Sequence, residues 1–324
     1  MQQLVVTRDM FESQLELAIS KVKDPRIGLF GPDSMMWKLS RHALFGAHGS
    51  GRALLLQIAH PWVTRGVDEH SKTRSDPLGR AKRTFTTVLS IVYGDLDQAT
   101  KYARAVHNVH SRIQGTMDSG AGAFGEGTPY MANEANALLW VHATLWDTTV
   151  MMYELFRRPL SVEEKDRFYN ETKLFAYMFG IPDEILPPDW ESFKEYNRCM
   201  WDSDQLKVTD STRELAAFLF APLHFTLTPA MAWLKITTAA TLPIRLRDEF
   251  NLPYERKERL IFASGRKILS VAEPITPGLI RNGPAYVEAS RRIRGLPSTI
   301  MTRALTRAMF GRPELVALKQ PTKP

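Results

Sequence analysis

Two histidines with helical spacing are the first candidates for chemistry in this chain. His107 and His110 lie three residues apart, and His110 shares its expected helix face with Ala103, Val106 and Ile113. An imidazole on such an apolar stripe can bind a haem iron through a neutral nitrogen, while the apolar side chains enclose the porphyrin. A single histidine in this position is also common as a satisfied core residue. These residues alone leave both interpretations open.

Two arginines and a threonine form a second candidate group. Arg80, Arg83 and Thr84 follow Pro77, which can begin a helix, and spacings of three and four place their side chains on one face. Guanidinium groups pair with carboxylates, including haem propionates, or polarise bound oxygen. The alternative is an ordinary solvated start of a basic helix that continues to Tyr93.

His142 repeats the histidine pattern on a third predicted helix. It lies in line with Leu138 and Leu145, and the large side chains of Trp140 and Trp146 are close to it in sequence. This helix could form one wall of a cofactor pocket. Aromatic residues at helical spacing are more often plain core, so this alternative also stays open.

The chain lacks the motifs of several other kinds of site. Its one cysteine excludes an internal disulfide and a multi-cysteine metal site. It contains no His-Glu-x-x-His zinc motif, no paired Glu-x-x-His di-iron motif and no nucleophile elbow. The glycines in 120–125 match a dinucleotide-binding spacing, but they follow a predicted helix and not a strand. We therefore expect them to form a loop beside a pocket, with an ordinary surface loop as the alternative.

Helical periodicity dominates the whole sequence. Apolar residues recur at spacings of three and four, and no strand is predicted. With 44% hydrophobic and 24% charged residues, the 324 residues can build a sizeable core. We predict a single all-α domain over 1–324, in which the candidate residues lie on helices at 80–93, 97–114 and 133–156. Gly94 is expected to end the first of these in the left-handed conformation.

Charge and hydropathy limit the partners. The net charge of +7 is scattered and no nucleic-acid motif is present, so no nucleic-acid binding is predicted. The N-terminus lacks the apolar core of a signal peptide, which together with the single cysteine favours a cytoplasmic location. The apolar stretch 215–244 contains prolines and a lysine and is predicted to be a buried helical hairpin. Because Arg245 and Arg247 flank it, peripheral membrane contact through 215–247 is a further expectation.

Three consecutive segments resemble the family of latex clearing protein (rubber oxygenase) and mpaB-type oxygenases. The first is LLLQIAHP at 54–61, followed by Val67 and by His70 with its serine neighbour. The second is DPLGR at 76–80 with the arginine and threonine at 83 and 84. The third is VHSRIQG at 109–115, with LWVHAT at 139–144 downstream. The resemblance extends from about residue 31 to about residue 247, which leaves 248–324 as a C-terminal helical extension.

This resemblance implies a fold and a cofactor. The family's fold is an all-α, globin-like multi-helix bundle around a pocket for haem b, in which His110 corresponds to the proximal iron ligand. Arg80 and Thr84 correspond to residues of the haem pocket, and His142 is expected to line it. Arg83 stands where the rubber oxygenase has a lysine that can approach the iron, and arginine is a poor iron ligand. Glu69 lies in the region of the rubber oxygenase's catalytic glutamate, without a residue-by-residue match.

The resemblance also implies an activity. We expect a haem-dependent oxygenase that uses dioxygen on a hydrophobic, unsaturated or lipid-like substrate, with oxidative cleavage of a carbon–carbon double bond as one form of the reaction. Arg80 and Thr84 are its expected catalytic residues. The alternatives are a haem or lipid binding protein without turnover and a helical scaffold in which His110 is a core residue. The sequence leaves the substrate, the distal ligand and the oligomeric state open.

Overall fold

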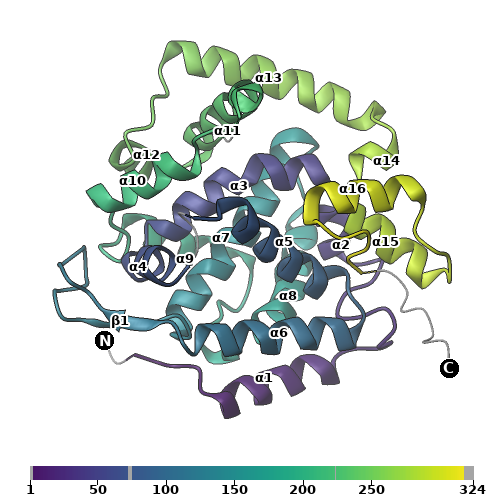
Figure 1. Ribbon diagram of the computed structural model, residues 1–324, viewed down its shortest axis with the longest axis horizontal. Helices are drawn as coiled ribbons and strands as arrows, with labels where there is room; N and C mark the ends of the chain where they lie inside the picture. The colour runs from purple at the N-terminus through teal and green to yellow at the C-terminus, as the bar shows by residue number, and fades with distance from the viewer. Residues whose placement is uncertain (1–2, 72–74, 223, 317–324) are drawn as a thin grey trace.

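A helix that is apolar on every side organises the fold. In the computed structural model, which describes residues 3–71, 75–222 and 224–316, α7 (Ala135–Phe156) runs through the middle of the molecule (Figure 1). Its buried side chains lie on all faces, as expected for a helix surrounded by others. Its N-cap is Glu134, whose carboxylate accepts a hydrogen bond from the Ala137 amide at 2.7 Å, one residue after the predicted start at 133.

The prediction of an all-α fold is confirmed, whereas a globin-like arrangement remains a prediction. A two-stranded antiparallel sheet, β1 (Gln114–Thr116) and β2 (Pro129–Met131), is the only sheet in the described ranges. The other helices are α1 (Arg8–Ser20), α2 (Met35–Ser40), α3 (Ala43–Ile58), α4 (Pro61–His70), α5 (Pro77–Tyr93), α6 (Leu96–His110), α8 (Val162–Tyr177), α9 (Trp190–Asp202), α10 (Asp210–Leu219), α11 (Thr228–Thr241), α12 (Ile244–Glu249), α13 (Arg256–Ile275), α14 (Gly278–Arg281), α15 (Pro284–Ile293) and α16 (Ile300–Phe310), with 3-10 turns η1 (Asp183–Ile185) and η2 (Phe225–Leu227).

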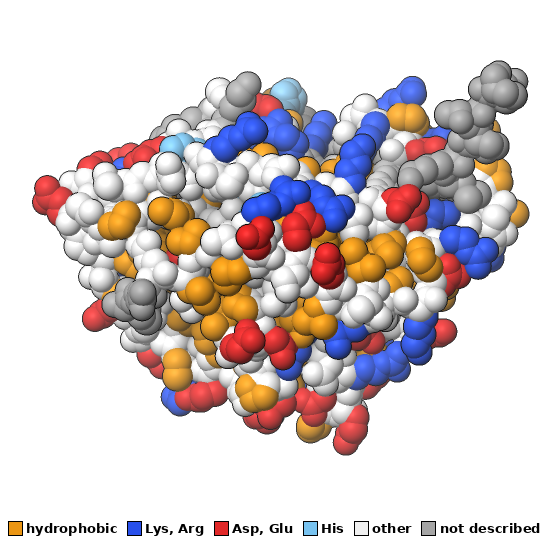
Figure 2. Space-filling view, turned by 90° about the horizontal axis from the view of Figure 1, so that it is seen from below, with side chains coloured by type: hydrophobic (Ala, Val, Ile, Leu, Met, Phe, Trp, Pro, Cys, Tyr) orange, Lys and Arg blue, Asp and Glu red, His pale blue; other side chains and the backbone are white. Residues whose placement is uncertain are grey.

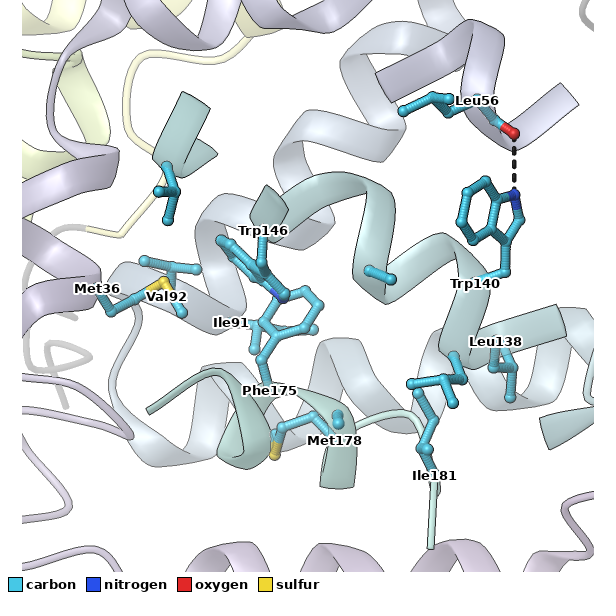
Figure 3. Packing of buried hydrophobic residues seen from close by; sticks show 14 of the residues in the cluster. Met36, Leu56, Ile91, Val92, Leu138, Trp140, Trp146, Phe175, Met178 and Ile181 are labelled. Atoms are coloured by element: carbon cyan, nitrogen blue, oxygen red, sulfur yellow. Dashed lines mark hydrogen bonds between the residues drawn. The ribbon is translucent and has the colours of Figure 1, made fainter. Parts of the chain in front are cut away.

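One large apolar cluster joins these helices around α7. Figure 3 shows members of it from α2, α3, α5, α7 and α8. The indole nitrogen of Trp140 donates to the Leu56 carbonyl of α3 at 2.9 Å, so the polar atom of this buried ring is satisfied. Trp146 meets Phe175 of α8 edge to face, with ring centroids 4.8 Å apart. The aromatic residues near His142 are therefore part of the core.

Helices α5 and α6 form a tight antiparallel hairpin that positions two of the candidate residues. Gly94 between them is extended (φ −69°, ψ 163°), so the prediction of a left-handed cap is wrong. A glycine is still required, because a Cβ there would lie 2.2 Å from the Ser90 carbonyl oxygen. Asp95 caps α6 by accepting from the Gln98 amide at 2.7 Å. Since α6 ends at His110, the hairpin brings its last turn and the first turns of α5 to one end of the molecule.

The C-terminal helices cover α3 and α7 on one side. In the apolar stretch predicted as a buried hairpin, α11 packs on α3 and buries its last turns, whereas η2 is exposed. Helix α13 lies outside α11 (Figure 1). It is fastened to the core by the buried Glu273, whose carboxylate accepts from Arg157 at 2.5 Å and lies 2.7 Å from Nδ1 of His42.

The surface that carries α1 is of mixed character. Seen from below, hydrophobic side chains form patches that acidic and basic side chains separate (Figure 2). Among the residues that the structure describes, no helix combines the length and the apolar composition needed to cross a membrane.

Candidate functional site

His110 is the last residue of α6, and its ring is built into the protein. Its Nδ1 atom is buried and has no hydrogen-bond partner within the described ranges. Burial lowers the pKa of His110 to about 4, and the nearby His107 has a smaller effect in the same direction. The imidazole is therefore neutral at pH 7. A neutral imidazole with an unused nitrogen is the form that binds a haem iron.

The two histidines on α6 have different surroundings. His107 stacks on Phe11 of α1 with ring centroids 4.3 Å apart, and Asn133 donates to its backbone carbonyl at 3.3 Å. These contacts match the interpretation of a satisfied core residue. A pocket of about 440 Å³ reaches both histidines, between the N-terminal segment 5–8 and the end of α6. Of the pair, His110 is the one whose ring nitrogen is left unused.

Only one of the three predicted residues on α5 turns inward. Arg80 is half-buried, and its guanidinium forms no hydrogen bond or ion pair with any residue that the structure describes. Burial lowers the pKa of Arg80, and the charge of Arg83 lowers it further. Arg83 itself is 61% exposed and pairs with Asp76 at 3.2 Å, and Thr84 is exposed as well. Arg80 is thus an inward cation without a counter-charge, the arrangement that suits an anionic ligand group.

His142 lies deep in the core on α7. Its Nδ1 accepts a hydrogen bond from the Trp146 indole at 3.2 Å, and its ring lies 6.3 Å from that of Phe175. Its Nε2 is buried without a partner among the described residues, and burial lowers the pKa of His142 to about 3. The contacts of its ring are with α7 and α8, away from the α5–α6 hairpin that holds Arg80 and His110 at one end.

A polar network between α4 and β2 was missed by the sequence reasoning. The Tyr130 hydroxyl donates to the Glu69 carboxylate at 2.5 Å and lies 2.9 Å from Nε2 of His70. Arg65 pairs with Glu69 one helical turn away at 3.0 Å. Burial, together with the hydrogen bond to Glu69, raises the pKa of Tyr130. The spacing of Arg65 and Glu69 was readable from the sequence, whereas Tyr130 comes from β2, sixty residues further on.

Two glycines place this network against the end of α6. A Cβ on Gly66 of α4 would lie 3.4 Å from Ile113, three residues after His110. A Cβ on Gly115 of β1 would lie 2.7 Å from the Tyr130 hydroxyl. Small residues at both positions allow α4 and the strands to approach closely.

A second apolar cluster adjoins this network through Tyr130. It consists of Trp62, Met117, Ala121, Phe124, Tyr130 and Ala137. The glycine-rich loop predicted beside a pocket takes part in it, since the Phe124 ring lies 4.7 Å from that of Trp62. His60 is buried against both rings, and burial lowers its pKa to about 4.

The donor set fits a haem better than a metal ion held by side chains alone. Within the described part of the chain, no group of three or more His, Cys, Asp or Glu side chains is arranged to hold a metal ion. A haem needs one neutral imidazole, apolar walls and cations for its propionates. His110 supplies the first of these. Arg80 is a half-buried cation at the same end of the α5–α6 hairpin, but it does not line the pocket that reaches His110, and Arg83 and Thr84 are exposed in this structure.

Comparisons with known proteins concern the family and not the cofactor. The family described as "ER-bound oxygenase mpaB/B'/Rubber oxygenase, catalytic domain" matches residues 37–271. An uncharacterized protein of Mycobacterium bovis and one of Mycobacterium tuberculosis are each 24% identical over 230 residues, which cover 69% of this chain and 87% of the relative. No solved structure matches the chain significantly. The matched region contains α3 to α12 and nearly all of α13.

Proposed function

Because this chain belongs to the mpaB/rubber oxygenase catalytic-domain family, we propose that it is a haem b-dependent oxygenase that acts with dioxygen on a hydrophobic, unsaturated substrate. The observation that supports the cofactor is His110, a neutral imidazole with a buried, unused nitrogen at the end of α6. Haem would supply the binding and activation of dioxygen. The protein would hold and orient the haem and enclose the apolar substrate.

Individual residues have distinct roles in this proposal. His110 binds the iron from the end of α6, and Arg80 pairs with a propionate, because its inward cation has no other described partner. Thr84 and Arg83 lie further along the same helix face and are exposed, so their part is at the rim of the site. His142 acts through the core packing of α7 and not through contact with the iron.

Oxidative cleavage of a double bond fixes the ratio of oxygen consumed to carbonyl groups formed. In oxidative cleavage of a carbon–carbon double bond, one dioxygen molecule is consumed, the double bond breaks, and each carbon receives one oxygen atom as a carbonyl group. No external reductant is required for this balance. Oxygen uptake and carbonyl formation are then expected in a ratio of one to two.

Absorption spectra test the iron ligand. We expect the protein, produced with a haem precursor, to show a Soret band that is lost in His110→Ala and kept in His107→Ala. The second variant is a matched control, since it removes the same side chain one turn earlier on the same helix. A Soret band unchanged in His110→Ala would refute the assignment of the ligand. No Soret band in the wild type would refute the haem.

Oxygen uptake separates the enzyme from a carrier. With an unsaturated hydrocarbon such as squalene, an oxygenase consumes oxygen in the wild type and not in His110→Ala. Haem binding without any uptake, across a panel of unsaturated hydrocarbons and lipids, would instead support the alternative of a haem or lipid binding protein.

A further inference from the structure

Helix α13 presents an apolar stripe to solvent. Leu260, Ile268, Val271 and Ile275 are between 60% and 79% exposed, and Ile261 beside them is 39% exposed. Ile261, Ile268, Val271 and Ile275 are three, four or seven residues from their neighbours in the set, and Leu260 is eight residues before Ile268, so all five lie on one side of the helix. A surface helix normally turns such a stripe inward. Of the nineteen large hydrophobic side chains exposed in the described ranges, fourteen follow residue 224, so this part of the chain differs from the rest.

The opposite side of α13 is already packed against the rest of the protein, so the stripe faces solvent. Phe262 stacks on Trp233 of α11 with ring centroids 6.2 Å apart. Gly265 lies under the same indole, where a Cβ would be 2.4 Å from the ring. At the other end, the buried Glu273 is bound by Arg157. A rotation of the helix that buried the stripe would break all three contacts.

Unpaired cations accompany the stripe. Arg256, Lys257, Arg259, Arg266 and Lys267 are exposed on α13, and none forms an ion pair with a residue that the structure describes. The acidic residues of the helix do not balance them, because Glu258 is used in the N-terminal capping box and Glu273 is buried. With about 3.6 residues per turn, Arg256, Lys257 and Lys267 lie on or beside the stripe, whereas Arg259 and Arg266 lie on the far flank of the helix. The outer side of α13 is therefore both apolar and positively charged.

We propose that this outer side of α13 docks on the surface of an anionic lipid bilayer. An amphipathic helix with apolar residues flanked by lysine and arginine lies in the interface, with the stripe at the headgroup boundary and the cations against the lipid phosphates. A second copy of this chain fits less well, because a two-fold contact through the stripe would bring the unpaired cations of both copies together. The contact lies on α13, outside the 215–247 stretch expected from the sequence. It is independent of the proposed haem chemistry.

Co-sedimentation with vesicles tests the charge. We expect the full chain to bind vesicles of equimolar phosphatidylcholine and phosphatidylglycerol, and phosphatidylcholine alone much more weakly. Lys257→Ala/Lys267→Ala should weaken binding about 25-fold, since each basic residue at such a surface contributes about fivefold. Lys23→Ala/Lys101→Ala removes two exposed cations on the α1 and α6 side of the molecule, opposite α13 (Figure 1), and should leave binding unchanged. Equal losses in the two pairs would overturn the proposal.

A pair of valines tests the stripe. Val271 on α13 and Val162 on α8 are 63% and 59% exposed, so serine at either position changes the free protein alike. Val271→Ser should lower vesicle binding about tenfold, as burial of a valine predicts, and Val162→Ser should have no effect. Absence of binding to anionic vesicles would overturn the proposal. So would self-association in sedimentation velocity that Val271→Ser abolishes while vesicle binding stays unchanged.

Discussion

Replacing Arg80 by methionine is expected to change haem affinity and stability of the haem-free protein in opposite directions. In the haem-free protein the guanidinium is half-buried without a described partner, and burial lowers its pKa. A charge in that position loses hydration without compensation. With haem bound, the same cation can form a charge-assisted hydrogen bond to a propionate. Arg80 is thus expected to increase the affinity for haem and to lower the stability of the haem-free protein.

The magnitudes follow from these two effects. A hydrogen bond between charged groups contributes about 1.5–3 kcal/mol, so the haem Kd of Arg80→Met should rise about 10- to 150-fold. Relief of the uncompensated charge should stabilise the haem-free protein by about 1 kcal/mol. For 324 residues the unfolding entropy is about 0.7 kcal/mol/K, which converts this gain into an increase in Tm of about 1.5 °C.

Arg83→Met is the matched control on the same helix. Its guanidinium is 61% exposed and is already paired with Asp76, and an exposed pair of this kind contributes at most about 1 kcal/mol. Haem titration followed at the Soret band gives the affinities, and scanning calorimetry of haem-free protein gives Tm. If Arg80→Met lowers Tm and affects haem binding no more than Arg83→Met does, the role assigned to Arg80 is wrong.

Two further predictions concern buried polar groups. Arg52 is fully buried, donates to Thr148 at 2.6 Å and pairs with Asp147 at 2.7 Å. Arg52→Met should therefore lower the free energy of unfolding, measured by calorimetry, by about 3–5 kcal/mol, because it leaves the Asp147 charge unpaired. Adding Asp147→Leu should recover most of this loss, and strictly additive effects of the two substitutions would contradict the pairing. His142 has a folded pKa of about 3 and an unfolded value near 6.5, so its contribution to stability is full above pH 6.5 and falls with pH by about 1.4 kcal/mol per unit. Between pH 7 and pH 4.5 the wild type should therefore lose about 2.7 kcal/mol more than His142→Leu, and parallel losses would show that His142 is not held neutral.

The class of fold and the helices of the site were within reach of the sequence. Apolar spacing and cap residues predict α5 and α7 within a few residues, because these helices bury regular apolar faces and begin at polar caps. The end of α6 was predicted four residues too late, since the chain leaves the helix at His110 to form β1. Strands of three residues carry too little periodicity to be recognised.

Site residues could be predicted only where the pattern that identifies them lies within a single helix. His110 was identified from its own apolar stripe and from family resemblance, and its role as iron ligand stays a prediction; the structure shows that its Nδ1 atom is buried without a described partner. Spacing put Arg80, Arg83 and Thr84 on one helix face but could not show that only Arg80 turns inward, because inward and outward depend on the neighbouring helices. Tyr130 was missed because its partner Glu69 is brought to it by the tertiary fold.

The attachment through Glu273 joins α13 to two helices at the centre of the molecule. One carboxylate contacts the end of α7 through Arg157 and the start of α3 through His42, so three helices share a single buried joint. A buried charge cannot be released without a large cost, which makes the joint stiff. Since the carboxylate would lose these partners if α13 moved away, any displacement of α13 is coupled to the end of α7 and the start of α3.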